Sequence, residues 1–226
     1  MLKKGAAERA LGRAVSTGGD FAEIFYEDTR SSRIGQTDDR IDTATTGRIH
    51  GAGLRVYKGT NSVYVHTNDT SDAGLMALAE RAADAVDSVR GEDRQIQLSG
   101  SIVKNIHEIR ELPMDVSGER RRALVREACR AARAESAEIA HVTGALWDWE
   151  QAVTIANTEG MFVSDQRVYT RASVTAVASG KGENQTGSES PGAMMGFELF
   201  STREDMNARA REAARRARAN IRRKNG

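Results

Sequence analysis

The sequence predicts an α+β fold of two units, each built from an antiparallel sheet with flanking helices. Three observations support this prediction. Apolar residues recur with the helical period in some segments and with a period of two in others. The strand-like runs are joined by short polar turns, which is typical of antiparallel meanders. The order helix, strands, helix occurs twice along the 226 residues.

The first unit is predicted to begin with a helix over residues 6–15, which Gly18-Gly19 ends. A strand follows, in which the odd residues 21–29 face one way and Ala22, Ile24 and Tyr26 face the other. Three further strands are expected over residues 40–45, 48–57 and 61–66. A helix over residues 73–88, capped by Thr70, Ser71 or Asp72, completes the unit.

The second unit repeats this outline. We expect a domain over residues 1–90, a linker over 91–113 and a second domain over 114–226. The second domain should hold helices at 118–135 and 202–221, with strands at 139–147, 152–156, 162–165 and 168–179. The polar stretch from Gly180 to Gly196 is either a functional loop or a disordered hairpin tip.

Composition excludes several classes of protein. Lys and Arg number 33 against 32 Asp and Glu, and 39% of residues are hydrophobic, so the chain is neither disordered nor polybasic. No apolar run of about 18 residues could span a bilayer, and the N-terminus lacks a signal-peptide core. Cys129, the single cysteine, can form no intrachain disulfide. We therefore expect a soluble, cytoplasmic protein.

Several segments form a recognisable pattern by their order and spacing. They are Gly-Asp-Phe-Ala-Glu-Ile at 19–24, Asp-Arg-Ile at 39–41, Gly-Ala-Gly-Leu-Arg-Val at 51–56, Ile-Ala-Asn-Thr-Glu-Gly at 155–160, the strand at 168–177, Gln185-Thr186-Gly187 and Gly196-Phe197. In this combination the chain resembles the N-terminal and middle regions of the TldD/PmbA family, once described as modulators of DNA gyrase. The resemblance covers residues 5–219, and the glycine-rich stretch is more similar to the TldD side.

The resemblance implies a zinc metallopeptidase that acts on unfolded peptides. It also implies a dimer, either of like chains or of a TldD-like chain with a PmbA-like partner. In this family the metal is held in a C-terminal domain, on a helix bearing His-Glu-x-x-x-His. Two imidazoles on one helix face can share a zinc ion while the adjacent glutamate serves as general base.

That zinc motif does not occur in this chain. The four histidines are His50, His66, His107 and His141, and none lies within one helical turn of another. Only His107 precedes a glutamate, Glu108, and no second histidine follows at helical spacing. We therefore assign no catalytic residue and no metal ligand, expect no cofactor in this chain, and leave the substrate-binding residues unassigned.

The simplest interpretation is the N-terminal and middle part of a longer family member, without the catalytic C-terminal domain. Peptide hydrolysis by this chain alone is then not expected. The alternatives are a natural short form that acts as an inactive partner subunit, or a standalone module that binds nucleic acid or protein through the arginine-rich helix at 202–221. An apolar seam on that helix favours a docked structural element. Its members are Met206, Ala210, Ala213, Ala214, Ala217 and Ile221. We expect no membrane partner, and nucleic acid is the less favoured one.

Other patterns are weak. Ser101 and Lys104 have the Ser-x-x-Lys spacing by chance, because the companion motifs of that chemistry are absent. Gly47, Gly51 and Gly53 are expected in turns and close packing rather than in a phosphate loop. Trp147 and Trp149 should share one strand face and pack in a core or interface. Met194-Met195 offers an adaptable apolar contact.

Overall fold

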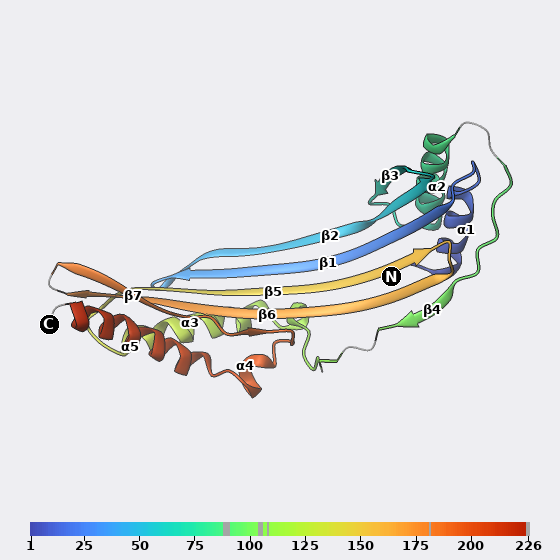
Figure 1. Ribbon diagram of the computed structural model, residues 1–226. Coiled ribbons are helices and arrows are strands. Elements are labelled where there is room, and N and C mark those ends of the chain that lie inside the picture. Colours follow the sequence, from blue (N-terminus) through green and yellow to red (C-terminus); the bar gives the residue numbers. More distant parts are fainter. Residues whose placement is uncertain (88–90, 104–105, 108, 181, 225–226) are drawn as a thin grey trace. The chain divides into compact units, whose positions relative to one another are not determined.

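The structure, a computed structural model, describes residues 1–87, 91–103, 106–107, 109–180 and 182–224 (Figure 1). It confirms the α+β class. The chain forms two compact units. Unit 1 holds residues 1–29, 48–106 and 151–166, and unit 2 holds residues 30–47, 107–150 and 167–226. This division in space differs from the expected division at 1–90, 91–113 and 114–226, because four long strands each contribute to both units.

The strands form one sheet in the order β3-β2-β1-β5-β6-β4, with β7 and β8 also paired to β6. Their bounds are β1 Phe21–Thr37, β2 Arg40–Lys58, β3 Asn61–Thr67, β4 Ser99–Ile102, β5 Ile139–Asn157, β6 Met161–Gly180, β7 Glu183–Glu189 and β8 Gly192–Ala193. β1 and β5 run antiparallel, since Asp38 N–H donates to Val142 O at 2.7 Å and Thr158 N–H donates to Ala22 O at 3.0 Å. β4 pairs with β6 in parallel.

Several strands are longer than the sequence predicted. The breaks expected at Thr46-Gly47 and at Ser164–Arg167 are wrong, because β2 and β6 pass through them as extended chain. Threonine favours extended backbone, and Gly47 does not adopt the positive φ that a tight turn demands. The sequence also predicts turns at Thr37-Asp38-Asp39, Lys58-Gly59-Thr60 and residues 157–160, and the structure confirms a turn at each place.

Helices pack on one face of the strands in unit 1. They are α1 (Lys4–Ala14) and α2 (Asp72–Val86), and the Ser71 hydroxyl caps α2 by accepting a bond from Gly74 N–H at 3.1 Å. Ala22, Ile24 and Tyr26 are buried in this core, so the predicted alternation of β1 is confirmed there. The odd positions 21–27 of β1 point to the opposite, open face, where they are exposed or half-buried, whereas Thr29 is buried.

The expected linker contributes to the core of unit 1. Ile96 and Leu98 are buried in the same cluster as the helix residues of α1. Arg94 N–H donates to Gly12 O at 3.3 Å, and Leu98 N–H donates to the Glu8 carboxylate at 3.1 Å. Residues 94–98 are therefore held against α1 by packing and by hydrogen bonds.

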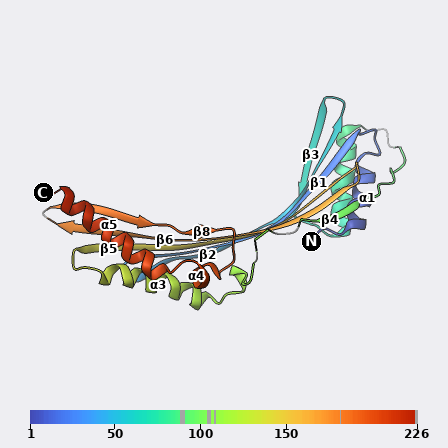
Figure 2. The ribbon, with the colours of Figure 1, turned by 60° about the horizontal axis from the view of Figure 1, so that its bottom comes forward.

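Unit 2 is built in the same way, with helices on one face of its strands (Figure 2). Its helical elements are η1 Pro113–Asp115, α3 Gly118–Ala134, α4 Leu199–Thr202 and α5 Met206–Lys224. The Ser117 hydroxyl caps α3 by accepting a bond from Arg120 N–H at 3.2 Å. All six residues of the predicted α5 seam are buried. Cys129 packs in this core, and burial raises the pKa of its thiol to about 12.

Candidate functional site

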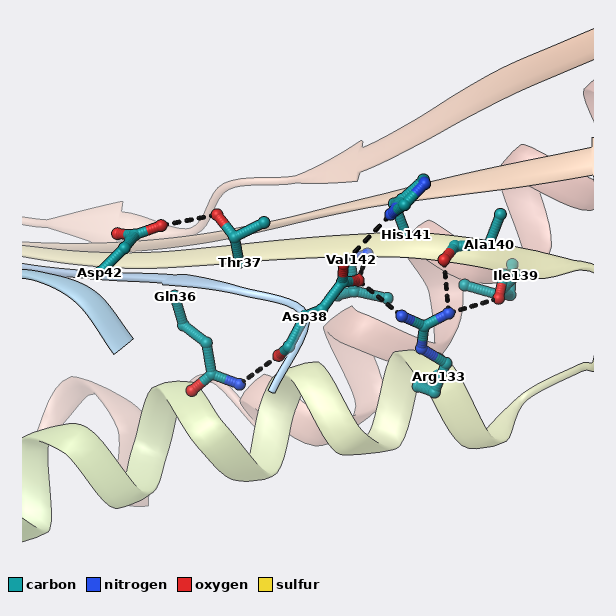
Figure 3. A network of polar contacts seen from close by, with 9 residues as sticks. All are labelled: Gln36, Thr37, Asp38, Asp42, Arg133, Ile139, Ala140, His141 and Val142. Atoms are coloured by element: carbon teal, nitrogen blue, oxygen red, sulfur yellow. Dashed lines mark hydrogen bonds and ion pairs between the residues drawn. The ribbon is translucent and has the colours of Figure 1, made fainter. Parts of the chain in front are cut away.

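A polar network closes the β1–β2 turn in unit 2 (Figure 3). Asp38 has a φ of 51°, in the left-handed region that aspartate tolerates better than most residues. Its carboxylate accepts bonds from Val142 N–H at 3.0 Å and from the Arg133 guanidinium at 2.5 Å, and it lies 3.1 Å from His141 Nδ1. These contacts lower the pKa of Asp38, with the His141 bond as the largest cause. The network fixes the turn to β5 and α3.

A buried ion pair lies beneath α3. Asp148 on β5 has a fully buried side chain and lies 3.5 Å from the Arg121 guanidinium. The Ser32 hydroxyl bridges the two, donating to Asp148 at 3.1 Å and accepting from Arg121 at 2.5 Å. Desolvation raises the pKa of Asp148 to about 6. Nothing in the sequence distinguished Asp148 from a solvated strand residue, so sequence reasoning missed this pair.

The open face of unit 2 carries a shallow polar depression of about 250 Å³. Trp147 and Trp149 alternate with buried Asp148 on β5, which confirms that they share a face. Of the two expected environments, the core is wrong, because both side chains are only half-buried on the open face, whereas packing in an interface stays a prediction. The Arg33 guanidinium sits 5.4 Å from the Trp147 ring, within range of a cation–π contact.

A second groove, of about 240 Å³, lies on the open face of unit 1. Three strands line it, and β3 is placed by its register on β2, in which Gly53 faces His66 and Arg55 faces Tyr64. We call it the unit 1 groove. Its lining residues are Phe25, Glu27, Ile49, His50, Gly51, Ala52, Gly53, Tyr64, His66, Thr67 and Asn68. The alternation of β1 predicted that Phe25 and Glu27 share a face, but the sequence did not predict which residues of β2 and β3 join them.

Among the described residues, the histidines do not form a zinc site. His50 Nε2 lies 3.0 Å from the Thr70 hydroxyl, His66 stacks on Tyr64, and His141 contacts Asp38. Within the described ranges, no group of three or more His, Cys, Asp or Glu side chains is placed to hold a metal ion. The donor set that a zinc peptidase needs is therefore not found among these residues.

Two of the weak sequence patterns fall partly on residues that lie outside the described ones. Lys104 and Glu108 lie outside the described residues, so the geometry of the pairs Ser101/Lys104 and His107/Glu108 is not described. Ser101 itself lies on β4, paired with Val163 of β6.

The three glycines that were expected in turns and close packing lie in a strand. Gly47, Gly51 and Gly53 all lie within strand β2, so the turn assignment is wrong. Close packing is confirmed for Gly53, because a Cβ there would lie 2.3 Å from the Tyr64 hydroxyl.

The stretch from Gly180 to Gly196, expected to be a functional loop or a disordered hairpin tip, contains the strand β7. β7 pairs with β6 from Gly180↔Glu183 to Val174↔Glu189, with Lys181 outside the described residues. Gly187 lies directly under α5, where a Cβ would meet Ala213 O at 2.1 Å. Met194 is 42% exposed and Met195 is buried. The polar composition of this stretch reflects a strand covered on one side by a helix.

The arginines of α5 are largely paired with carboxylates of unit 2. Arg218 binds Glu138 at 2.7 Å, Arg215 binds Glu135 at 2.8 Å, and Arg216 binds Glu189 at 2.5 Å. Hydrogen bonding from Arg218 lowers the pKa of Glu138. These pairs reduce the positive potential that a phosphate backbone would meet.

Two models of one protein family match most of the chain. The model of the PmbA/TldA metallopeptidase domain 1 matches residues 22–86, and the model of the PmbA/TldA metallopeptidase central domain matches residues 111–221. The chain belongs to the TldD/PmbA family. The expected resemblance is thereby confirmed.

Two curated relatives agree with this assignment. A metalloprotease of Methanothermobacter thermautotrophicus is 27% identical over 198 residues, which cover 88% of this chain and 42% of the relative. A metalloprotease TldD homolog of Haemophilus influenzae is 23% identical over 208 residues, which cover 89% of this chain and 43% of the relative. The chain thus spans less than half the length of these relatives.

Solved structures share the fold. A proposed modulator of a DNA gyrase from Thermotoga maritima superposes with a TM-score of 0.74 at 16% identity, covering 94% of this chain and 47% of that one. TldE from Thermococcus kodakarensis gives a TM-score of 0.67 at 14% identity, with the same coverage of 94% and 47%. Among the described helices, none is long and apolar enough to cross a membrane.

Proposed function

We propose that this chain is the non-catalytic, peptide-holding part of a TldD/PmbA-type zinc metallopeptidase. The observation that carries the proposal is the match of domain 1 and the central domain of that family to a chain in whose described part no group of three or more His, Cys, Asp or Glu side chains is placed to hold a metal ion. Such a part would help to shape the substrate cavity and the dimer of the whole enzyme. Zinc and hydrolysis would belong to residues other than those described.

The outer edge of β3 supports a role in holding peptides. β3 ends the sheet order and pairs only with β2 among the described strands. In a two-residue hairpin the closing pair Lys58↔Asn61 is hydrogen-bonded, so by alternation the backbone groups of Tyr64 and His66 point outward. Arg81 already donates to the outward His66 carbonyl at 3.2 Å, which agrees with this assignment. Extended peptides can pair with such an edge whatever their side chains.

Dimerisation and a cytoplasmic location complete the proposal. A family member of this kind would pair with a like chain or with a related subunit, and light scattering of the purified chain, alone and with a PmbA-like protein, tests both forms. The single buried thiol of Cys129 suits a reducing compartment.

Nucleic-acid binding through α5 is the rival function. The ion pairs of Arg215, Arg216 and Arg218 argue against it, as does the burial of the apolar seam. A salt titration of DNA binding separates the two functions. We expect binding only at low salt, and measurable affinity near physiological salt would favour the rival.

The proposal is tested by mixing the purified chain with a labelled, unfolded peptide. Fluorescence anisotropy should report binding, while mass spectrometry should recover the peptide intact after long incubation. Substitution of Ser62, whose backbone also points outward, by proline should weaken binding, because proline removes an outward N–H. Serine to alanine at the same position is the matched control and should leave binding unchanged.

A further inference from the structure

Three large apolar side chains are exposed to solvent in the unit 1 groove. Phe25, Ile49 and Tyr64 are 40%, 65% and 56% exposed, and all three line the same groove. Large apolar side chains gathered in one place on a surface mark an interaction site more often than single exposed ones do.

Glycines shape the floor of this groove. A Cβ at Gly53 would lie 2.3 Å from the Tyr64 hydroxyl, and one at Gly51 would lie 2.7 Å from Thr67 O. The Tyr64 ring therefore lies across Gly53 and forms a wall. The Arg55 guanidinium already lies 5.3 Å from the centre of that ring, so Phe25 offers the aromatic surface without a described cation.

Glu27 gives the unit 1 groove a negatively charged side chain. It lies two residues from Phe25 on the open face of β1, and its Oε1 accepts bonds from Gln151 at 2.9 Å and from Thr29 at 2.5 Å. No described cation forms an ion pair with Glu27, whereas the neighbouring Asp28 binds Arg48 at 2.8 Å. Glu27 is thus a half-buried carboxylate with a fixed position and an oxygen, Oε2, left to accept from a ligand.

We propose that the unit 1 groove binds the basic side chain of a peptide, an arginine or a lysine. The aliphatic stem would cover Phe25 and Ile49, and the charged head would meet Glu27. A neutral apolar occupant would desolvate the Glu27 carboxylate without pairing it, and an acidic occupant would be repelled. This inference rests on the proposed peptide-holding function and adds a side-chain preference to it.

The test compares two probes of closely similar shape, of which one is charged and the other neutral. Fluorescein-labelled unfolded heptapeptides carry either one central arginine or citrulline, its neutral isostere, in a glycine, serine and alanine background. We expect the arginine peptide to bind about fivefold more tightly, the ratio expected for one partly exposed ion pair. Glu27→Gln should bring this ratio to about one.

Glu23→Gln is the matched control, because Glu23 lies on the same face of β1 outside the groove and forms no described ion pair. Glu23→Gln should leave the ratio of arginine-peptide to citrulline-peptide affinity unchanged. Circular dichroism should show that both variants are folded. Equal binding of the two peptides to the unaltered chain would overturn the inference and leave the proposed function standing. A preference that survives Glu27→Gln would overturn it as well, and failure of both peptides to bind would remove the peptide-holding function itself.

Discussion

The Arg121 guanidinium of α3 lies 3.5 Å from the Asp148 carboxylate of β5, and the Asp148 side chain is completely buried. Ser32 of β1 bridges the pair. A helix and two strands of unit 2 are therefore joined by a buried ion pair and its bridging hydroxyl. Removing one member of such a pair leaves a buried charge unpaired, which destabilises more than replacing both members with apolar groups.

Arg121→Met should lower the free energy of unfolding by about 3 kcal/mol, because Asp148 would then be buried without a cation. Urea unfolding followed by circular dichroism measures this. The double variant Arg121→Met with Asp148→Leu should recover most of the loss. Arg130→Met, at an exposed position on the same helix, should change stability by less than about 0.5 kcal/mol. Equal effects of Arg121→Met and Arg130→Met would contradict the pairing.

The same aspartate should make stability depend on pH. Desolvation raises the pKa of Asp148 from 3.8 to about 6, while Ser32 and Arg121 oppose the shift. The folded state therefore holds the Asp148 proton more tightly than the unfolded state, so its contribution to stability is present at low pH and is lost as pH rises from 3.8 to about 6.

Asp148→Asn removes this titration. The difference in unfolding free energy between the unaltered chain and the variant should fall by up to about 1.4 kcal/mol per pH unit between about pH 4 and pH 6. Urea unfolding of both proteins across that range measures the difference. A difference that stays constant with pH would show that Asp148 does not titrate there.

Gly187 should be intolerant of any side chain. A Cβ at this position would lie 2.1 Å from Ala213 O and 2.6 Å from Ala217 N, so Gly187→Ala would push α5 away from β7. We expect a loss of about 1–3 kcal/mol in unfolding free energy. Gly180→Ala is the control, because its Cβ would make ordinary contact with Ile221 at 3.5 Å. Similar thermal stability of the two variants would contradict the close approach of helix and strand.

These predictions show where sequence periodicity is informative. The seam of α5 and the alternation of β1 were both predicted, because each follows from the spacing of apolar residues within one element. The break at Thr46-Gly47 was predicted wrongly, since turn-forming residues can also extend when neighbouring strands pair with them.

The candidate site was predictable only in part. Phe25 and Glu27 could be placed on one face from β1 alone, but Tyr64 joins them through the register of β3 on β2. Register depends on contacts between segments, which a single sequence does not display. The burial of Asp148 escaped prediction for the same reason, since its partner Arg121 lies on another element.

Zinc analysis of the purified chain tests the central claim most directly. After equilibrium dialysis against zinc and removal of loosely bound metal, elemental analysis should find no stoichiometric zinc, and an unfolded peptide should stay uncleaved while it remains bound. This follows because, among the described residues, no group of three or more His, Cys, Asp or Glu side chains is placed to hold a metal ion, and because His50, His66 and His141 contact Thr70, Tyr64 and Asp38 instead. About one tightly held zinc per chain, together with peptide cleavage that a chelator abolishes, would contradict a non-catalytic role.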